Sequence, residues 1–245
     1  MSNLKVMTIL GTRPEIIRLA RVMARLEDHV DHVIVHTGQN WDYELNEIFF
    51  EDLGVRKPDH FLGAGGGSLG ETLGSILTGT EKVLNQEKPD AVVVLGDTNS
   101  AISAIMARRL KVPVYHMEAG NRSFDRNVPE ETNRRLVDHI ADFNLVYTEH
   151  ARRHLLAEGL EHRRINLIGS PMREVLDYYR PQIDASDVVK RLGLTPRGYF
   201  IASLHREENV DNKDRLTSLV ESLNTLAQTH EIPVILSTHP RTRKR

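Results

Sequence analysis

The 245-residue sequence contains no cysteine. Disulfide bridges, thiolate nucleophiles and zinc sites built on thiolates are therefore excluded. The sequence also lacks an apolar run that approaches the roughly 20 residues needed by a membrane-spanning helix. Its N-terminal segment is interrupted by Gly11 too soon to be a secretory signal. From these absences we expect a cytoplasmic protein that does not enter a membrane.

A large excess of charge of either sign is also missing, because 34 acidic residues nearly balance 32 basic ones and leave a formal net charge of −2. Binding to nucleic acid or to an anionic membrane surface would require a basic face. We therefore expect no nucleic-acid partner and no membrane partner. The length suits one large domain or two smaller ones.

Short β-branched runs alternate with longer amphipathic segments, which predicts βαβ units and a parallel sheet. The predicted strands are residues 5–10, 32–36, 60–62, 91–95, 114–117, 143–147, 165–168, 200–204 and 234–237. The predicted helices are residues 14–26, 42–53, 69–86, 100–110, 130–141, 151–158, 173–179, 186–192 and 213–229.

The alternation of predicted strands and helices is interrupted between residues 169 and 196, which indicates a domain boundary. We expect an N-terminal Rossmann-like domain over 1–170, and a linker helix followed by the first part of a second domain over 171–245. The two strands predicted in the second part cannot form a parallel sheet that is covered on both faces. The fold class is therefore α/β, with the second domain incomplete in this chain.

Ionisable residues follow four of the predicted strands directly: Arg13 with Glu15, then Asp97, Glu118 and His205. In an open parallel sheet the carboxyl ends of the strands form one rim, and ligands bind outside it. The sequence therefore predicts the functional site at this rim. A metal site is not expected, because no His, Asp and Glu spacing matches a known ligand pattern.

The turn from Gly11 to Glu15 joins a strand directly to a helix. A helix N-terminus presents unpaired N–H groups, and the guanidinium of Arg13 suits phosphate oxygens, so the turn predicts an anion site. The alternative is an ordinary turn with a surface arginine.

Asp97 and Glu118 end neighbouring strands, so their carboxylates are expected to lie near each other. Two close carboxylates acquire separated pKa values, which lets one act as acid and the other as base. Arg122 is the expected ion-pair partner of Glu118. The alternative for Asp97 is a helix cap.

Glu130 and Glu131 begin a helix, where acidic residues favour the helix dipole. At least one of them is expected to be structural, and the other to reach the site. Among the histidines, His205 has the placement that best fits a catalytic role, and His116 and His239 follow it.

The segment from Gly65 to Gly70 matches G-x-G-x-x-G. It follows the third strand rather than the first, and no acidic residue closes the next strand, because Asp90 opens it. We therefore expect a glycine loop over the site rather than a nicotinamide-binding turn. A Tyr-x-x-x-Lys pair is also absent.

Several motifs in this order together resemble the non-hydrolysing UDP-N-acetylhexosamine 2-epimerases; they are GTRPEIIR, HTGQNWDY, LGDTNS, HMEAGNRSFD, VPEETNRR and SLHREEN. The resemblance implies two Rossmann-like domains of the glycosyltransferase-B type that face each other across a cleft. It implies removal of the C2 proton while UDP leaves C1, and return of UDP after reprotonation on the other face. It also implies no cofactor, and a homodimer in the full-length protein.

The resemblance assigns catalytic roles to Asp97, Glu118, Glu130 and His205. The residues that it implies bind the UDP-linked N-acetylamino sugar are Arg13, Arg18, Gln39, Arg122, Arg134 and His239. For Gln39 and the neighbouring His36, simple packing is the alternative.

Within the family, the motifs are most similar to enzymes that make UDP-N-acetyl-L-fucosamine for capsule or O-antigen from a UDP-2-acetamido-2,6-dideoxy-L-talose. Arg18 stands where UDP-N-acetylglucosamine 2-epimerases commonly have Lys, and the two cations are not interchangeable. The alternative is interconversion of UDP-N-acetylglucosamine and UDP-N-acetylmannosamine. Family members continue beyond this point with part of the nucleotide site, so little turnover is expected from the 245-residue chain.

Three rival functions stay open on the sequence. A glycosyltransferase of the B type would share the fold and the donor but would need an acceptor. A non-catalytic UDP-sugar sensor would bind without chemistry. A hydrolysing epimerase would release free sugar and UDP.

Overall fold

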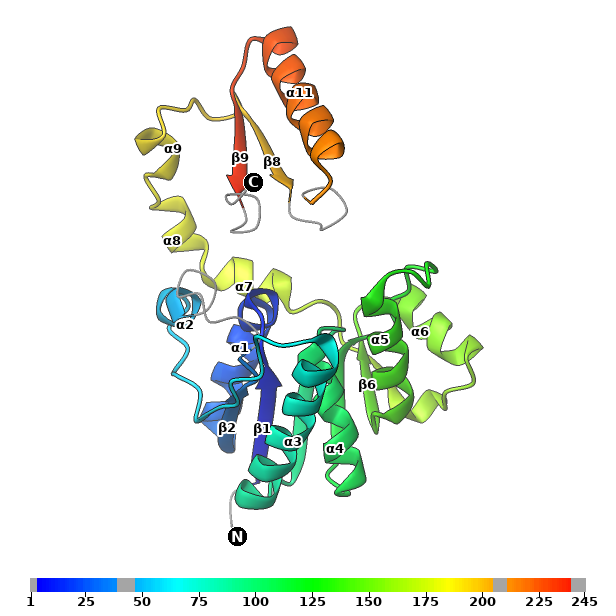
Figure 1. The fold of residues 1–245 in the computed structure, drawn as a ribbon. Coiled ribbons are helices and arrows are strands. Elements are labelled where there is room, and N and C mark those ends of the chain that lie inside the picture. The colour runs from blue at the N-terminus through cyan, green and yellow to red at the C-terminus, as the bar shows by residue number, and fades with distance from the viewer. Residues whose placement is uncertain (1–3, 39–46, 205–210, 239–245) are drawn as a thin grey trace. The chain divides into compact units, whose positions relative to one another are not determined.

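The structure is a computed structural model that describes residues 4–38, 47–204 and 211–238. The chain divides into two compact units, Met1–Tyr179 and Arg180–Arg245 (Figure 1). The strands of the first unit are β1 Lys5–Leu10, β2 Asp31–His36, β3 His60–Phe61, β4 Ala91–Leu95, β5 Val114–Ala119, β6 Phe143–Val146 and β7 Ile165–Leu167. Its α-helices are α1 Arg13–His29, α2 Glu47–Asp52, α3 Leu69–Glu87, α4 Ala104–Arg109, α5 Pro129–Ile140, α6 Glu149–Ala157 and α7 Met172–Tyr178.

The sheet of the first unit has the order β3-β2-β1-β4-β5-β6-β7, and all its strand pairs are parallel. The chain adds β2 and β3 on one side of β1 and then crosses to β4 on the other side. The strand order therefore reverses between β1 and β4. In open α/β sheets, ligands bind at such a switch point, outside the carboxyl ends of the strands. The predicted α/β fold with a parallel sheet is confirmed.

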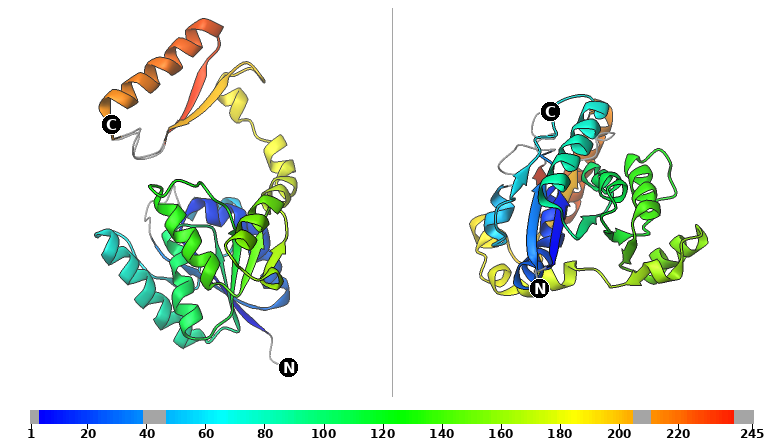
Figure 2. Two further views of the ribbon diagram at one scale, coloured as in Figure 1. Left: turned by 90° about the vertical axis from the view of Figure 1, so that its right-hand side faces the viewer. Right: turned by 90° about the horizontal axis from the view of Figure 1, so that it is seen from below.

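Both faces of the sheet are buried, which explains why its strands read as continuous apolar runs. Alternate residues of β1 belong to two different clusters: Met7 and Ile9 pack with residues of α3, α4 and α5, while Val6 and Leu10 pack with residues of α1. Figure 2 shows the helices in layers on the two sides of the sheet.

The segment after β4 differs from the prediction of one helix over 100–110. A 3₁₀ helix, η2 Asn99–Ser103, precedes α4. Thr98 caps η2 by accepting a hydrogen bond from the backbone N–H of Ser100, and the buried hydroxyl of Ser103 donates to the carbonyl of Ser100 at 2.6 Å. Local side-chain bonds of this kind compete with regular α-helical bonding.

Helix α7 packs on α1 and belongs to the first unit. The guanidinium carbon of Arg21 lies 3.5 Å from the ring centroid of Tyr178, and the hydroxyl of Tyr179 donates to the carbonyl of Leu53. The second unit starts after this helix, whereas the sequence analysis placed the start of the linker at residue 171.

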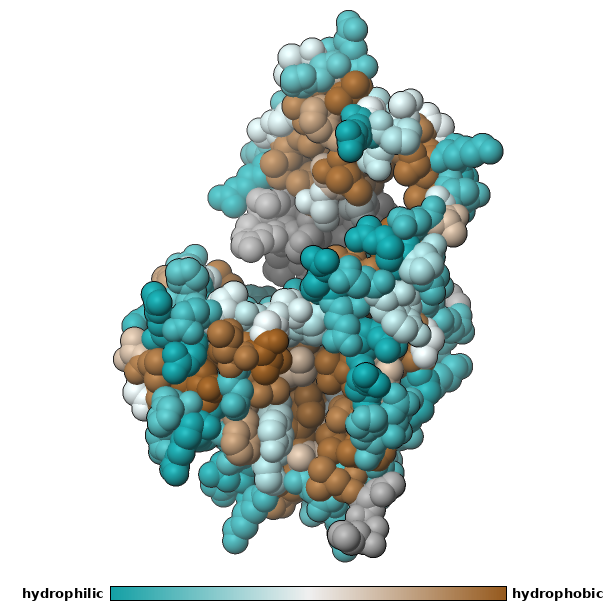
Figure 3. Space-filling view, turned by 180° about the vertical axis from the view of Figure 1, so that it is seen from behind, coloured by the Kyte–Doolittle hydropathy of each residue, from teal (hydrophilic) through white to brown (hydrophobic). Residues whose placement is uncertain are grey.

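The second unit contains α8 Arg180–Asp184, α9 Val188–Arg191, β8 Phe200–Leu204, α11 Lys213–His230 and β9 Val234–Thr238. Strands β8 and β9 are parallel neighbours. Within the described part of this unit, no residue is buried, and Ile201 on β8 is 74% exposed. Figure 3 shows apolar side chains at the surface of this unit. One face of the two strands is half-buried against α11, and the other face, which carries Ile201, is exposed.

Candidate active site

Glu118 lies at the end of β5 in an irregular part of the sheet. Met117 pairs with Leu145 and Ala119 pairs with Val146, so Glu118 is an extra residue without a partner in the ladder. Its φ of 63° is in the left-handed region, which a residue with a side chain rarely adopts. Bulges and backbone strain of this kind occur at functional sites, where they redirect a side chain.

The carboxylate of Glu118 has a cationic partner from the first helix. Arg18 Nη1 on α1 binds Glu118 Oε2, and Asn121 Nδ2 donates to Oε1 at 3.4 Å. Burial raises the pKa of Glu118; Arg18 opposes this rise, and the nearby charge of Asp97 adds to it. Glu118 therefore takes up a proton more readily than an exposed glutamate does.

Asp97 follows β4, the neighbour of β5, and is held by α5. Arg134 Nε donates to Asp97 Oδ2 at 3.0 Å, and Arg134 Nη2 binds the same oxygen. Asn133 Nδ2 donates to the backbone carbonyl of Asp97 at 2.9 Å. The structure thus brings together Asp97, Glu118, Arg18 and Arg134 at the carboxyl ends of β4 and β5.

Glu15 is a further carboxyl group of this rim; the sequence analysis placed it there but gave it no role in the site. It is 1% exposed, and it accepts hydrogen bonds from Gly11 N at 3.1 Å, from Thr12 Oγ1 at 2.8 Å and from Thr98 Oγ1 at 3.1 Å. Burial raises the pKa of Glu15 to about 7, although these hydrogen bonds oppose the rise. Glu15 therefore links the turn after β1 to the turn after β4.

Arg13 begins α1 and has an exposed side chain. Its guanidinium carbon lies 5.7 Å from the ring centroid of Phe49. It forms no ion pair with any residue in the described ranges. An exposed guanidinium at the start of a helix is free to meet an anion.

The two acidic residues at the start of α5 have different environments. Glu130 is exposed. Glu131 is 2% exposed and accepts hydrogen bonds from Ser123 N at 3.0 Å and from Arg135 Nε at 2.9 Å. Burial acts to raise the pKa of Glu131, but the bonds from Ser123 and Arg135 outweigh it and lower the pKa. Glu131 is therefore structural, whereas Glu130 is accessible.

The expected pairing of Glu118 with Arg122 is wrong. Arg122 has no exposed side-chain surface; its Nη1 donates to Asp138 Oδ2 at 2.7 Å and its Nη2 to Glu158 Oε2 at 2.6 Å. These carboxylates satisfy the guanidinium within the protein, so it does not face a ligand in this structure. The partner of Glu118 is Arg18, which is 100 residues away in the sequence.

Tyr147, directly after β6, is a second residue that the sequence analysis missed. Its hydroxyl oxygen is buried and has no hydrogen-bond partner within the described ranges. Burial raises the pKa of Tyr147, as does the charge of Glu118, while Arg18 opposes it. The hydroxyl therefore remains a protonated donor close to the Arg18–Glu118 pair.

Three predicted site residues, Gln39, His205 and His239, lie outside the described residues. His36 is described: it is 1% exposed and stacks on Phe61 with ring centroids 5.1 Å apart. This position agrees with the packing alternative.

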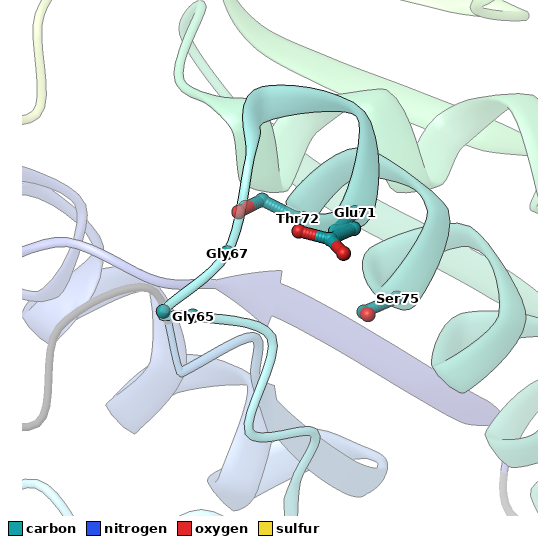
Figure 4. Close-up of a pocket in the computed structure, with 6 residues that line it drawn as sticks. Gly65, Gly67, Glu71, Thr72 and Ser75 are labelled. Atoms are coloured by element: carbon teal, nitrogen blue, oxygen red, sulfur yellow. The ribbon is translucent and has the colours of Figure 1, made fainter.

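The glycine loop precedes α3 and borders a hollow lined by Gly65, Gly66, Gly67, Glu71, Thr72 and Ser75 (Figure 4). Ser68 and Glu71 form a capping box: Glu71 N donates to Ser68 Oγ at 3.2 Å, and Ser68 N donates to Glu71 Oε2 at 2.6 Å. The hydrogen bond from the Ser68 backbone is the main cause that lowers the pKa of Glu71. These caps occupy N–H groups that a dinucleotide phosphate would need.

Across the described ranges, no group of three or more His, Asp and Glu side chains is arranged to hold a metal ion. Within the same ranges, every helix is too short or too polar to cross a membrane.

The family model for UDP-N-acetylglucosamine 2-epimerase matches residues 24–245. A solved UDP-N-acetylglucosamine 2-epimerase from Rickettsia bellii is 51% identical, with a TM-score of 0.91 over 99% of this chain and 64% of that one. The Methanocaldococcus jannaschii UDP-GlcNAc 2-epimerase, solved in complex with UDP-GlcNAc and UDP, is 42% identical with a TM-score of 0.90 over 98% of this chain and 67% of that one.

A third relative, UDP-2,3-diacetamido-2,3-dideoxy-D-glucuronate 2-epimerase from Pseudomonas aeruginosa, is 40% identical over 98% of this chain and 68% of its own length. The chain therefore spans about two thirds of the length of these relatives. Their similarity confirms the glycosyltransferase-B type of fold and agrees with an incomplete second domain. With the family model matching most of the sequence, this chain belongs to the UDP-N-acetylglucosamine 2-epimerase family.

Proposed function

We propose that the full-length protein is an isomerase that inverts C2 of a UDP-linked 2-acetamido sugar. The observation that supports this proposal best is the pair of carboxylates at the ends of β4 and β5. Asp97 is bound by Arg134. Glu118 lies on a strained bulge, is bound by Arg18, and has a pKa that is raised by burial. Two nearby carboxyl groups in different environments are suited to acid and base roles in one reaction.

The proposed reaction has two balanced halves. A carboxylate removes the C2 proton while the C1–O bond breaks, so UDP leaves with the electron pair and a C1=C2 double bond forms. A proton then returns to the opposite face of C2, and UDP adds again at C1. The C2 proton is only weakly acidic, so the departing diphosphate must be stabilised as its charge develops.

In this proposal Asp97, Glu118 and Glu130 are the acid/base carboxylates and His205 is the catalytic histidine, following the resemblance of their motifs. The cations that we assign to the diphosphate are Arg13, which is exposed, and Arg18 and Arg134, which already lie beside the carboxylates. Gln39 and His239 complete the proposed substrate set. We also expect the full-length protein to be a homodimer.

For the sugar itself we propose the UDP-2-acetamido-2,6-dideoxy-L-talose of UDP-N-acetyl-L-fucosamine synthesis, for surface polysaccharide. The similarity of the motifs supports this choice. Arg18 in place of Lys marks a difference from UDP-N-acetylglucosamine 2-epimerases, since the two cations are not interchangeable. Relatives at about the same identity are named for different sugars, UDP-N-acetylglucosamine in one and a diacetamido-glucuronate in another. The sugar therefore has to be tested directly.

The test is to incubate the full-length protein in deuterated water with the L-talose derivative, with UDP-N-acetylglucosamine and with the UDP-diacetamido-glucuronate. NMR should show deuterium at C2 of the sugar and nowhere else, fastest for the L-talose derivative. Faster labelling of another sugar would correct the substrate and keep the reaction.

The products separate the rival functions. Release of UDP only when an acceptor is added would indicate a glycosyltransferase, and accumulation of free sugar with UDP would indicate a hydrolysing enzyme. Binding of the UDP-sugars without any label at C2 would indicate a sensor and would contradict the proposal.

A further inference from the structure

A fully buried pair of polar residues lies behind the two site carboxylates. His116 on β5 and Asp138 on α5 both have 0% exposed side chains, and His116 Nδ1 lies 2.9 Å from Asp138 Oδ1. Neither side chain reaches solvent, so neither can touch a substrate. Burying such groups is costly unless each is bound by partners, and their partners are informative.

His116 forms a hydrogen bond with Gly96, the residue that precedes Asp97. Its Nε2 lies 2.8 Å from the carbonyl oxygen of Gly96. A carbonyl oxygen only accepts, so Nε2 donates this hydrogen bond. Gly96 has a φ of 69° and forms the sharp turn from which Asp97 leaves the strand. The imidazole therefore fixes the start of the Asp97 turn.

Asp138 accepts a hydrogen bond from Gly120, the residue two positions after Glu118. The backbone N–H of Gly120 points to Asp138, at 3.2 Å from Oδ1 and 3.3 Å from Oδ2. Gly120 is also confined on its other side, because a Cβ at this position would lie 2.4 Å from the carbonyl oxygen of Ala151. Asp138 therefore fixes the end of the bulge that contains Glu118.

The pair is continuous with a wider set of charges on one side of α5. Glu131, Arg134, Arg135 and Asp138 are spaced i, i+3, i+4 and i+7, so they share one side of the helix. Arg122 and Glu158 connect Asp138 to Arg135 through ion pairs of 2.6 to 2.9 Å. Arg134 connects the same helix to Asp97. Both ends of this network thus meet the Asp97 turn.

We propose that His116 and Asp138 are positioning residues that set the separation of Asp97 from Glu118 by holding Gly96 and Gly120. This inference rests on the proposed function, because the spacing matters only if both carboxylates act on one substrate. A displacement of about 1 Å in a reacting group can lower a rate by ~100-fold.

Two substitutions at His116 separate the contact with Gly96 from the contact with Asp138. In His116→Gln the amide nitrogen takes the place of Nε2 and keeps a donor for the carbonyl of Gly96. In His116→Asn the amide takes the place of Nδ1, faces Asp138 and leaves the Gly96 carbonyl without its donor. Both variants remove the imidazole and are uncharged, and each retains one of the two contacts, so a larger effect in His116→Asn shows that the bond to Gly96 contributes more than the contact with Asp138.

We expect kcat for C2 deuterium exchange by the full-length protein to fall by ~10- to 100-fold in His116→Asn, with KM little changed, and to fall much less in His116→Gln. Amide hydrogen exchange over residues 96–98 should rise in the Asn variant alone. His32→Asn, in another buried histidine bound to Thr8 Oγ1 at 2.9 Å, is the matched control and should retain kcat.

Equal kcat values and equal amide exchange in both His116 variants and the wild type would overturn the inference. Absence of C2 exchange in the wild type would contradict the proposed function instead, and the amide exchange over 96–98 would still test the role of His116. If His116→Asn fails to fold, the second comparison is Asp138→Asn against Asp138→Leu, since only Asn retains an acceptor for Gly120 N–H. Equal amide exchange over 118–121 in these two variants would also overturn the inference.

Discussion

At the residue scale, Glu118 differs from the neighbouring carboxylates in both backbone and environment. Its left-handed φ aims the side chain away from the regular ladder, where Arg18 meets it, whereas Glu131 is fully bonded inside the protein. Burial raises the pKa of Glu118, whereas in Glu131 the hydrogen bonds outweigh burial and lower the pKa. A group that exchanges a proton with a substrate needs a raised pKa like that of Glu118.

Replacing Glu118 by Gln should abolish C2 deuterium exchange and leave UDP affinity nearly intact in the full-length protein. The amide has a similar shape but cannot accept a proton, and the diphosphate is assigned to other residues. Exchange is measured by NMR and UDP binding by calorimetry. Glu149→Gln, at a surface glutamate that pairs with Arg152, serves as the control. Exchange at the wild-type rate in Glu118→Gln would remove Glu118 from the mechanism.

Glu15 leads to a prediction about pH. Its pKa is raised to about 7 in the folded protein from an ordinary value of 4.5, so between these values the folded state binds more protons than the unfolded state. Stability from this group is therefore complete below about pH 4.5 and is lost as the pH rises through about 7.

We expect the free energy of unfolding of the wild type, relative to Glu15→Gln, to fall by about 3 kcal/mol at most between pH 4.5 and pH 8. Urea titrations of both proteins across this range measure the difference. A difference that does not change with pH would mean that folding does not raise the pKa of Glu15.

At the element scale, local patterns were enough to place the strands of the sheet. The run AVVVL ends at a glycine and is β4, and the run from Lys5 to Leu10 is β1. The segment over 100–110 was predicted less well, because the hydroxyls of Thr98 and Ser103 bond to the backbone of Ser100 and favour a 3₁₀ helix that periodicity does not reveal.

The partners within the site were harder to predict than the elements. The proximity of Asp97 and Glu118 followed from the order of parallel strands. The choice of Arg18 over Arg122 did not, because it depends on which side chains of α1 and of the loop after β5 turn inward. The charged side of α5 looks like a solvated helix face in the sequence, yet Asp138 is fully buried. Only tertiary packing distinguishes these cases.

Gly120 should tolerate substitution poorly for two separable reasons. Its φ of 78° is unfavourable for a side chain, and a Cβ would collide with Ala151 O at 2.4 Å. Gly159 has a φ of 87° but no atom within 4 Å of its Cβ position, so it is the matched control. We expect Gly159→Ala to cost about 1–2 kcal/mol in the free energy of unfolding, and Gly120→Ala to cost clearly more, as measured by chemical denaturation. Equal costs would contradict the close contact with α6.

At the scale of the whole molecule, the buried core belongs to the first unit. The hydrophobic clusters of the described residues all lie within Met1–Tyr179, whereas the second unit has two strands and no buried described residue. A two-stranded sheet rarely has independent stability.

We therefore expect a fragment of residues 1–179 to unfold cooperatively on heating, and a fragment of residues 180–245 to show no cooperative transition. Circular dichroism at a helix wavelength and amide exchange measure both. A sharp transition in the isolated 180–245 fragment would show that its few contacts are sufficient for folding.

The bulge at Glu118 separates two requirements that usually fall on the same residue of a strand: pairing with the neighbouring strand, and presenting a particular side chain. Met117 and Ala119 have ladder partners on β6, and Glu118 between them has none. Glu118 is thus an extra residue in a paired sheet, and we expect that the side chain at this position can change without loss of strand pairing. A scaffold built in this way allows new chemistry to be tried at one position while the architecture that supports it is preserved.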